Sequence, residues 1–66
     1  MNSYFLFYSE NYENYEKKFE RKDDLEKFIR EKVIAFGDDF SIHKIFFGRE
    51  LKFEKKEVIV SYEIRD

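Results

Sequence analysis

The chain has 66 residues, enough for one domain with one hydrophobic core but not for a second. It contains no cysteine, which excludes a disulfide scaffold, a thiolate zinc site and a cysteine nucleophile. Thirteen basic against fifteen acidic residues give a net charge of −2, which disfavours a dedicated polyanion-binding protein, and an aromatic content of 21% disfavours disorder. We therefore expect a small globular domain rich in aromatic rings.

The first third of the chain is predicted to form a β-hairpin. Residues 4–8 are dense in β-forming side chains, and residues 15–20 alternate between two sets of side chains after a polar loop. Pairing Tyr8 with Tyr15 gathers the hairpin's large side chains on one face, namely Tyr4, Leu6, Tyr8 and Phe19. One long helix over residues 10–36 is the alternative, although polar residues interrupt its apolar stripe.

A helix is predicted over residues 23–36. Asp23, followed three residues later by Glu26, is typical of a capping box, and acidic residues in a first turn suit the helix dipole. Apolar residues then recur at three- and four-residue spacing, as Leu25, Phe28, Ile29, Val33 and Phe36. Gly37 follows as the residue that ends the helix.

The last third is predicted to contain three strands, over residues 40–47, 50–54 and 58–65. Turns at Gly48-Arg49 and Lys55-Lys56 separate them. The complete order is ββαβββ, an α+β fold in which one helix packs on one face of an antiparallel sheet of four to five strands. We expect the whole chain to form this one domain.

Side-chain alternation divides the predicted strands between two faces. If Gly48-Arg49 forms a two-residue turn, Ile42 and Phe46 lie on the face that the helix covers. One helix covers only one face, which leaves five apolar residues on the other: Phe5, Phe7, Ile45, Phe47 and Ile59. We predict that these five, with a rim of His43, Arg49 and Lys52, bind a protein partner or a second copy in a homodimer. Cover by loops or by lysine stems is the alternative.

Catalysis and metal binding are not predicted. His43 faces Glu54 in the predicted hairpin, but no serine nucleophile has a recognisable context. The acidic pairs Asp23-Asp24 and Asp38-Asp39 are explained by a helix start and a loop, and no loop supplies the oxygen ligands of a hard cation. Phosphate-binding and hydrolase motifs are absent from the sequence. We expect a protein that is not an enzyme and needs no cofactor.

The sequence carries no targeting signal. Met1-Asn2-Ser3 lacks a basic region, and the apolar run over residues 4–8 is too short for a signal or membrane helix. Together with the missing cysteines, this predicts a cytoplasmic protein that does not bind membranes.

Binding of single-stranded nucleic acid is the second functional hypothesis. The rings of Phe5, Phe7, Phe47 and His43 offer surfaces for base stacking. Five basic residues are available to hold phosphates, namely Lys18, Arg49, Lys52, Lys55 and Lys56. Acidic residues interleave with these bases, so we favour a protein partner over nucleic acid. A purely structural component of a larger assembly is a third hypothesis.

The sequence IHKIFFGREL over residues 42–51, together with the helix start KDDLEKFI, resembles small uncharacterised proteins of phages and mobile elements in low-GC bacteria. The resemblance extends over most of the chain and lies in its general character, since such proteins are short, rich in Lys, Glu, Phe and Tyr, and carry one helix between hairpins. They often act by binding, as inhibitors or modulators of host proteins. The resemblance therefore implies a non-enzymatic interaction module in a host cytoplasm, and it assigns no functional residue.

Overall fold

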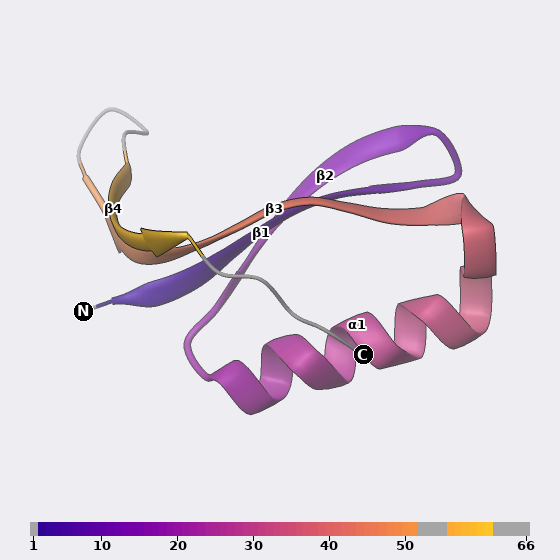
Figure 1. The fold of residues 1–66 in the computed structure, drawn as a ribbon, viewed down its shortest axis with the longest axis horizontal. Helices are drawn as coiled ribbons and strands as arrows, with labels where there is room; N and C mark the ends of the chain where they lie inside the picture. Colours follow the sequence, from indigo (N-terminus) through magenta and orange to yellow (C-terminus); the bar gives the residue numbers. More distant parts are fainter. Residues whose placement is uncertain (1, 52–55, 62–66) are drawn as a thin grey trace.

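The computed structural model describes residues 2–51 and 56–61 and shows one antiparallel sheet with one helix across it (Figure 1). The elements in chain order are β1 (Ser3–Glu10), β2 (Glu13–Phe19), α1 (Lys22–Phe36), the short 3-10 helix η1 (Gly37–Asp39), β3 (Phe40–Glu50) and β4 (Lys56–Ser61). The strands are ordered β2-β1-β3-β4, so β2 and β4 lie at the edges. The α+β class, the single helix and the antiparallel sheet are confirmed, with four strands in the described residues.

The β1–β2 hairpin has the predicted register, with Tyr8 opposite Tyr15. A two-residue turn joins the strands, and both of its residues have positive φ, 51° at Asn11 and 67° at Tyr12. This is the backbone geometry of a type I′ turn, whose twist matches that of the strands. The alternative of one long helix from residue 10 is wrong, because β-pairing continues to Phe19.

The helix begins one residue before Asp23, and its N-cap residue is Arg21 without a side-chain cap hydrogen bond. The predicted capping box at Asp23 is therefore wrong, since Asp23 lies inside the first turn, where its charge still favours the helix dipole. Gly37 ends the helix as predicted, at a φ of +56° that favours glycine, and its N–H donates to the Val33 carbonyl. In the described parts of the chain no helix combines the length and apolar character needed to cross a membrane.

The predicted turn at Gly48-Arg49 is wrong, because β3 continues through it to Glu50. Lys56, predicted to lie in a turn, is instead the first residue of β4, opposite Glu50. Leu51, predicted to lie in a strand over residues 50–54, is in no strand of the structure. The rest of that predicted strand and the end of the strand predicted over residues 58–65 fall on residues 52–54 and 62–65, outside the described residues.

The hydrophobic core lies between α1 and the sheet. From the helix it takes Leu25 and Ile29, which are buried, with Phe28 and Phe36 packed at its border. From the sheet it takes Leu6, Tyr8, Phe19, Phe40 and Ile45. The hairpin face predicted from alternation in β1 and β2 is therefore the face that the helix covers.

The side chains of β3 are distributed between the two faces of the sheet differently from the prediction, because a β-bulge at His43 inserts one extra residue. On β1, Phe7 is opposite Lys44 and Tyr8 is opposite Ile42, which leaves His43 between the two pairs. A bulge of one residue exchanges the two faces for the rest of the strand. Placing Ile45 and Phe47 on the outer face was therefore wrong, and Phe46 replaces them there.

Candidate docking site

The sheet face opposite α1, here called the back face, carries phenylalanine side chains from both central strands. Phe5 and Phe7 project from β1 to this face, and Phe46 lies opposite Phe5 on β3. Charged side chains flank these rings, because the cross-strand neighbours of Phe5 and Phe7 include Lys18 and Glu16 on β2 and Lys44 on β3. The back face is therefore apolar along its centre and charged at its borders.

One end of the back face, the closed end, is covered by β4. The Lys56 ammonium lies 5.5 Å from the centroid of the Phe5 ring and 5.6 Å from that of Phe7. It also forms a 2.7 Å ion pair with Glu16, on the strand at the opposite edge of the sheet. Phe5 is only 1% exposed although no helix covers it. A lysine from one edge strand and a glutamate from the other thus close this end.

Gly48 allows β4 to approach the sheet closely enough for this closure. A Cβ atom at Gly48 would lie 1.9 Å from the Glu57 carbonyl oxygen, a distance that only the absence of a side chain permits. The register shifts at this point, since Phe47 is opposite Val60 and Gly48 is opposite Val58. This irregularity bends the β3–β4 hairpin, as β-bulges commonly do.

The other end of the back face is an open hollow of about 540 Å³. Its lining residues, from β1, β2 and β3, are Phe7, Tyr8, Asn14, Tyr15, His43, Lys44 and Phe46. The Phe7 and Phe46 rings meet edge to face with their centroids 5.7 Å apart, and both remain half-buried. The volume is within the range of about 300–1,000 Å³ found for ligand pockets. The hollow can therefore accept an apolar side chain of a partner.

One lysine, Lys44, lines the hollow. Lys56 and Glu16 neutralise each other at the closed end. Lys18 and Lys44 are exposed and have no ion-pair partner among the described residues. Two lysines on this face therefore remain free to attract an acidic group.

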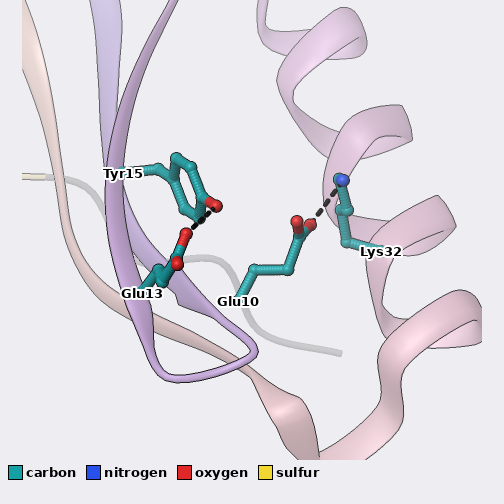
Figure 2. A network of polar contacts seen from close by, with 4 residues as sticks. All are labelled: Glu10, Glu13, Tyr15 and Lys32. Atoms are coloured by element: carbon teal, nitrogen blue, oxygen red, sulfur yellow. Dashed lines mark hydrogen bonds and ion pairs between the residues drawn. The ribbon is translucent and has the colours of Figure 1, made fainter.

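The helix side of the β1–β2 hairpin carries a separate set of polar contacts (Figure 2). Glu10 at the end of β1 forms a 2.5 Å ion pair with Lys32 of α1, which ties the hairpin to the helix. The Tyr15 hydroxyl donates a 2.7 Å hydrogen bond to Glu13 on the same strand. This bond and the negative charge of Glu13 raise the pKa of Tyr15 above its ordinary value. These contacts stabilise the hairpin end without occupying the back face.

The residues predicted to form the docking surface are not brought together. Phe7 and His43 line the hollow, whereas Phe5 is buried beneath Lys56. Ile45 is a core residue on the helix side, and Phe47 on the same side packs against Tyr4 with ring centroids 4.8 Å apart.

Two further predicted residues, Arg49 and Ile59, lie on β3 and β4. Arg49 forms a 2.6 Å ion pair with Glu57, and Ile59 is 54% exposed on the edge strand. Lys52 and Glu54, the predicted partner of His43, lie outside the described residues.

Sequence reasoning missed Phe46, Lys44 and Asn14 as residues of the hollow. Asn14 belongs to the predicted polar loop but lies in β2. Phe46 and Lys44 were missed because simple alternation places them on the helix side, and no turn or glycine marks the bulge at His43. The hairpin register was the one signal that could have found Asn14, since pairing Tyr8 with Tyr15 also pairs Ser9 with Asn14.

Within residues 2–51 and 56–61, no group of three or more histidine, aspartate or glutamate side chains could hold a metal ion. Compared with known protein families, with characterised proteins and with solved structures, the chain shows no significant match. Its function must therefore be inferred from the geometry of the site.

Proposed function

We propose that this protein is a non-enzymatic interaction module whose hollow binds an apolar side chain presented by an acidic segment of a protein partner. The observation that carries the proposal is the open hollow lined by Phe7 and Phe46 and by Lys44, a lysine without an ion-pair partner among the described residues. In protein interfaces, much of the binding energy commonly comes from a buried aromatic side chain that is surrounded by charged residues at the rim. A phage-type inhibitor or modulator of a host protein would act in this way.

A protein partner is favoured over single-stranded nucleic acid by the geometry of the rings. Nucleic-acid platforms stack successive bases on exposed aromatic faces, along a basic groove that follows the phosphates. Here the Phe7 and Phe46 rings meet at an interplanar angle of 73°, so they do not form a flat platform. Only two lysines on this face are free of ion pairs in the described chain, and the whole chain has a net charge of −2.

The test is a titration of ¹⁵N-labelled protein, followed by NMR, with a synthetic peptide in which one phenylalanine is flanked by glutamates. We expect the largest shifts at the backbone amides of Phe7, Lys44 and Phe46. A Lys44→Glu variant should weaken binding by about tenfold, because it places an acid at the rim that faces the acidic peptide. Lys27→Glu, at an exposed position of α1, makes the same charge change away from the hollow and should leave binding unchanged.

Three results would contradict the proposal. The first is a peptide that shifts no amide of the hollow, and the second is an equal loss of binding in both lysine variants. The third is tighter binding of an oligothymidine than of the peptide, with an affinity that falls steeply as salt is added, which would favour the nucleic-acid hypothesis.

A further inference from the structure

The turn of the β1–β2 hairpin presents an aromatic residue that does not serve the fold. Tyr12 is 96% exposed and has a φ of 67°, a left-handed conformation in which a type I′ turn favours glycine. Holding a residue other than glycine there strains the backbone. Tyr12 makes no hydrogen bond or ring contact with the described residues, so no such contact with them offsets this strain. An exposed tyrosine is suited to recognition, because tyrosine is among the residues enriched at binding hot spots.

Acidic side chains surround this tyrosine. The backbone N–H of Asn11 donates a 3.0 Å hydrogen bond to the Asp39 carbonyl oxygen, which holds η1 beside the turn. Glu13, Asp38 and Asp39 are all exposed there, and the last turn of α1 contains no basic residue. We call Tyr12 with these three acids the tip. The tip is an aromatic side chain on an acidic segment.

The tip therefore has the chemistry that the hollow is proposed to bind. We propose that the partner is a second copy of this chain, with Tyr12 of each copy inserted into the hollow of the other, against Phe7 and Phe46. This inference rests on the proposed function and names its partner. The acids of the tip would then lie near the free lysines of the back face, so the electrostatic attraction and the apolar contact favour the same pairing.

The position of the tip allows each copy to insert its Tyr12 into the hollow of the other. Asn14 and Tyr15, which line the hollow, follow Tyr12 by two and three residues on the same hairpin. Because tip and hollow lie at the same end of the molecule, two copies related by a twofold axis can satisfy both contacts at once. Such an association closes as a dimer and does not grow into a fibre. The contact area is small compared with that of standard interfaces, so the dimer should be weak and concentration-dependent.

The experiment measures mass by sedimentation equilibrium up to about 1 mM protein, a range that detects millimolar dissociation constants. We expect a monomer–dimer equilibrium in the natural chain. Tyr12→Gly should weaken dimerisation by at least about tenfold, as expected for loss of a central tyrosine anchor. The same variant should raise the melting temperature, because glycine relieves the strain at this turn. Tyr12→Phe keeps the ring and the strain and should dimerise like the natural chain.

A mixing experiment tests whether the contact is between tip and hollow. ¹⁵N-labelled Tyr12→Gly protein keeps its hollow, and unlabelled Lys44→Glu protein keeps its tip, so the mixture contains one intact contact that neither variant forms with itself. We expect the hollow amides of the labelled protein to shift on addition of the Lys44→Glu protein. They should not shift on addition of unlabelled Tyr12→Gly protein.

The outcomes separate this inference from the proposed function. A chain that stays monomeric but binds the acidic phenylalanine peptide would overturn the inference and leave the proposed function standing. A dimer that survives Tyr12→Gly would also overturn the inference, because another surface would then form the contact. A chain that neither dimerises nor binds the peptide would overturn both.

Discussion

The two faces of the sheet are built from the same strands but are covered in different ways. On the helix side, α1 places Leu25 and Ile29 against Leu6 and Ile45, and all four side chains are buried. On the back face, cover comes from β4, whose Lys56 reaches the opposite edge of the sheet. Figure 1 shows the helix running across one side of the sheet, while β4 lies at one edge.

The difference is clearest between Phe5 and Phe7, which lie on the same face of the same strand. Phe5 is fully buried, whereas Phe7 is half-buried and lines the hollow. Both rings are contacted by the Lys56 ammonium, but Phe5 also lies directly opposite Phe46. The exposure of an aromatic residue on this face is therefore decided by all of its neighbours, and not by its face of β1 alone.

The largest expected effect is on the free energy of unfolding, which a substitution on the helix side should lower more than one on the back face. Leu25→Ala removes a fully buried side chain and should cost about 2–5 kcal/mol of unfolding free energy. A domain of this size has a total stability of about 3–10 kcal/mol, so this variant should lose a large fraction of it. Phe7→Ala, at the half-buried edge of the hollow, should cost only about 1–2 kcal/mol. Urea unfolding followed by circular dichroism measures both; equal losses would show that the hollow belongs to the core.

A smaller effect is expected from Gly48→Ala, which should separate β4 from the back face. The new Cβ would meet backbone atoms of Glu57, so the strand must move, at a cost of about 1–3 kcal/mol. Amide hydrogen exchange should accelerate in β4 and remain slow in β1. Gly37→Ala is the matched control, since it introduces strain at a φ of +56° but meets no atom within 4 Å. Unchanged exchange in β4 of the Gly48 variant would contradict the role given to this glycine.

The sequence predicted the fold class, the hairpin register at Tyr8 and Tyr15, and the helix end at Gly37, because each depends on local patterns. It did not predict the composition of the hollow, because a single bulged residue at His43 exchanges the faces of β3 beyond it. The prediction of a turn at Gly48 was wrong for a related reason. Glycine is a turn signal in a sequence, and here it serves the close approach of another strand.

The ion pair between Lys56 and Glu16 should contribute a measurable but modest coupling. Lys56→Met keeps an apolar stem over the rings, Glu16→Gln removes the opposite charge, and the double variant completes the cycle. We expect a coupling free energy of about 0.5–1 kcal/mol, because Lys56 is mostly buried while Glu16 remains partly exposed. The exposed pair of Arg21 and Asp23, at 3.9 Å, should show almost none. If the two pairs show equal coupling, Lys56 covers the back face through its carbon chain alone.

The smallest expected effect concerns the helix side of the hairpin, where the pKa of Tyr15 depends on Glu13. The hydrogen bond to Glu13 holds the pKa of Tyr15 above its ordinary value of 10.0, with further contributions from partial burial and neighbouring acids. As the pH rises above 10.0, the unfolded chain loses this proton before the folded chain does. The stabilising contribution is therefore present below that pH and is lost as the pH rises through the folded pKa.

Glu13→Gln should lower the pKa of Tyr15 toward 10.0, and ¹³C-labelled tyrosine followed by NMR measures the shift for each ring separately. Tyr15→Phe assigns the resonance. Glu13 does not line the hollow, so peptide binding should survive Glu13→Gln. Loss of peptide binding in this variant would mean that the two faces of β2 are energetically coupled. The back face could then not be treated as a site independent of the helix side.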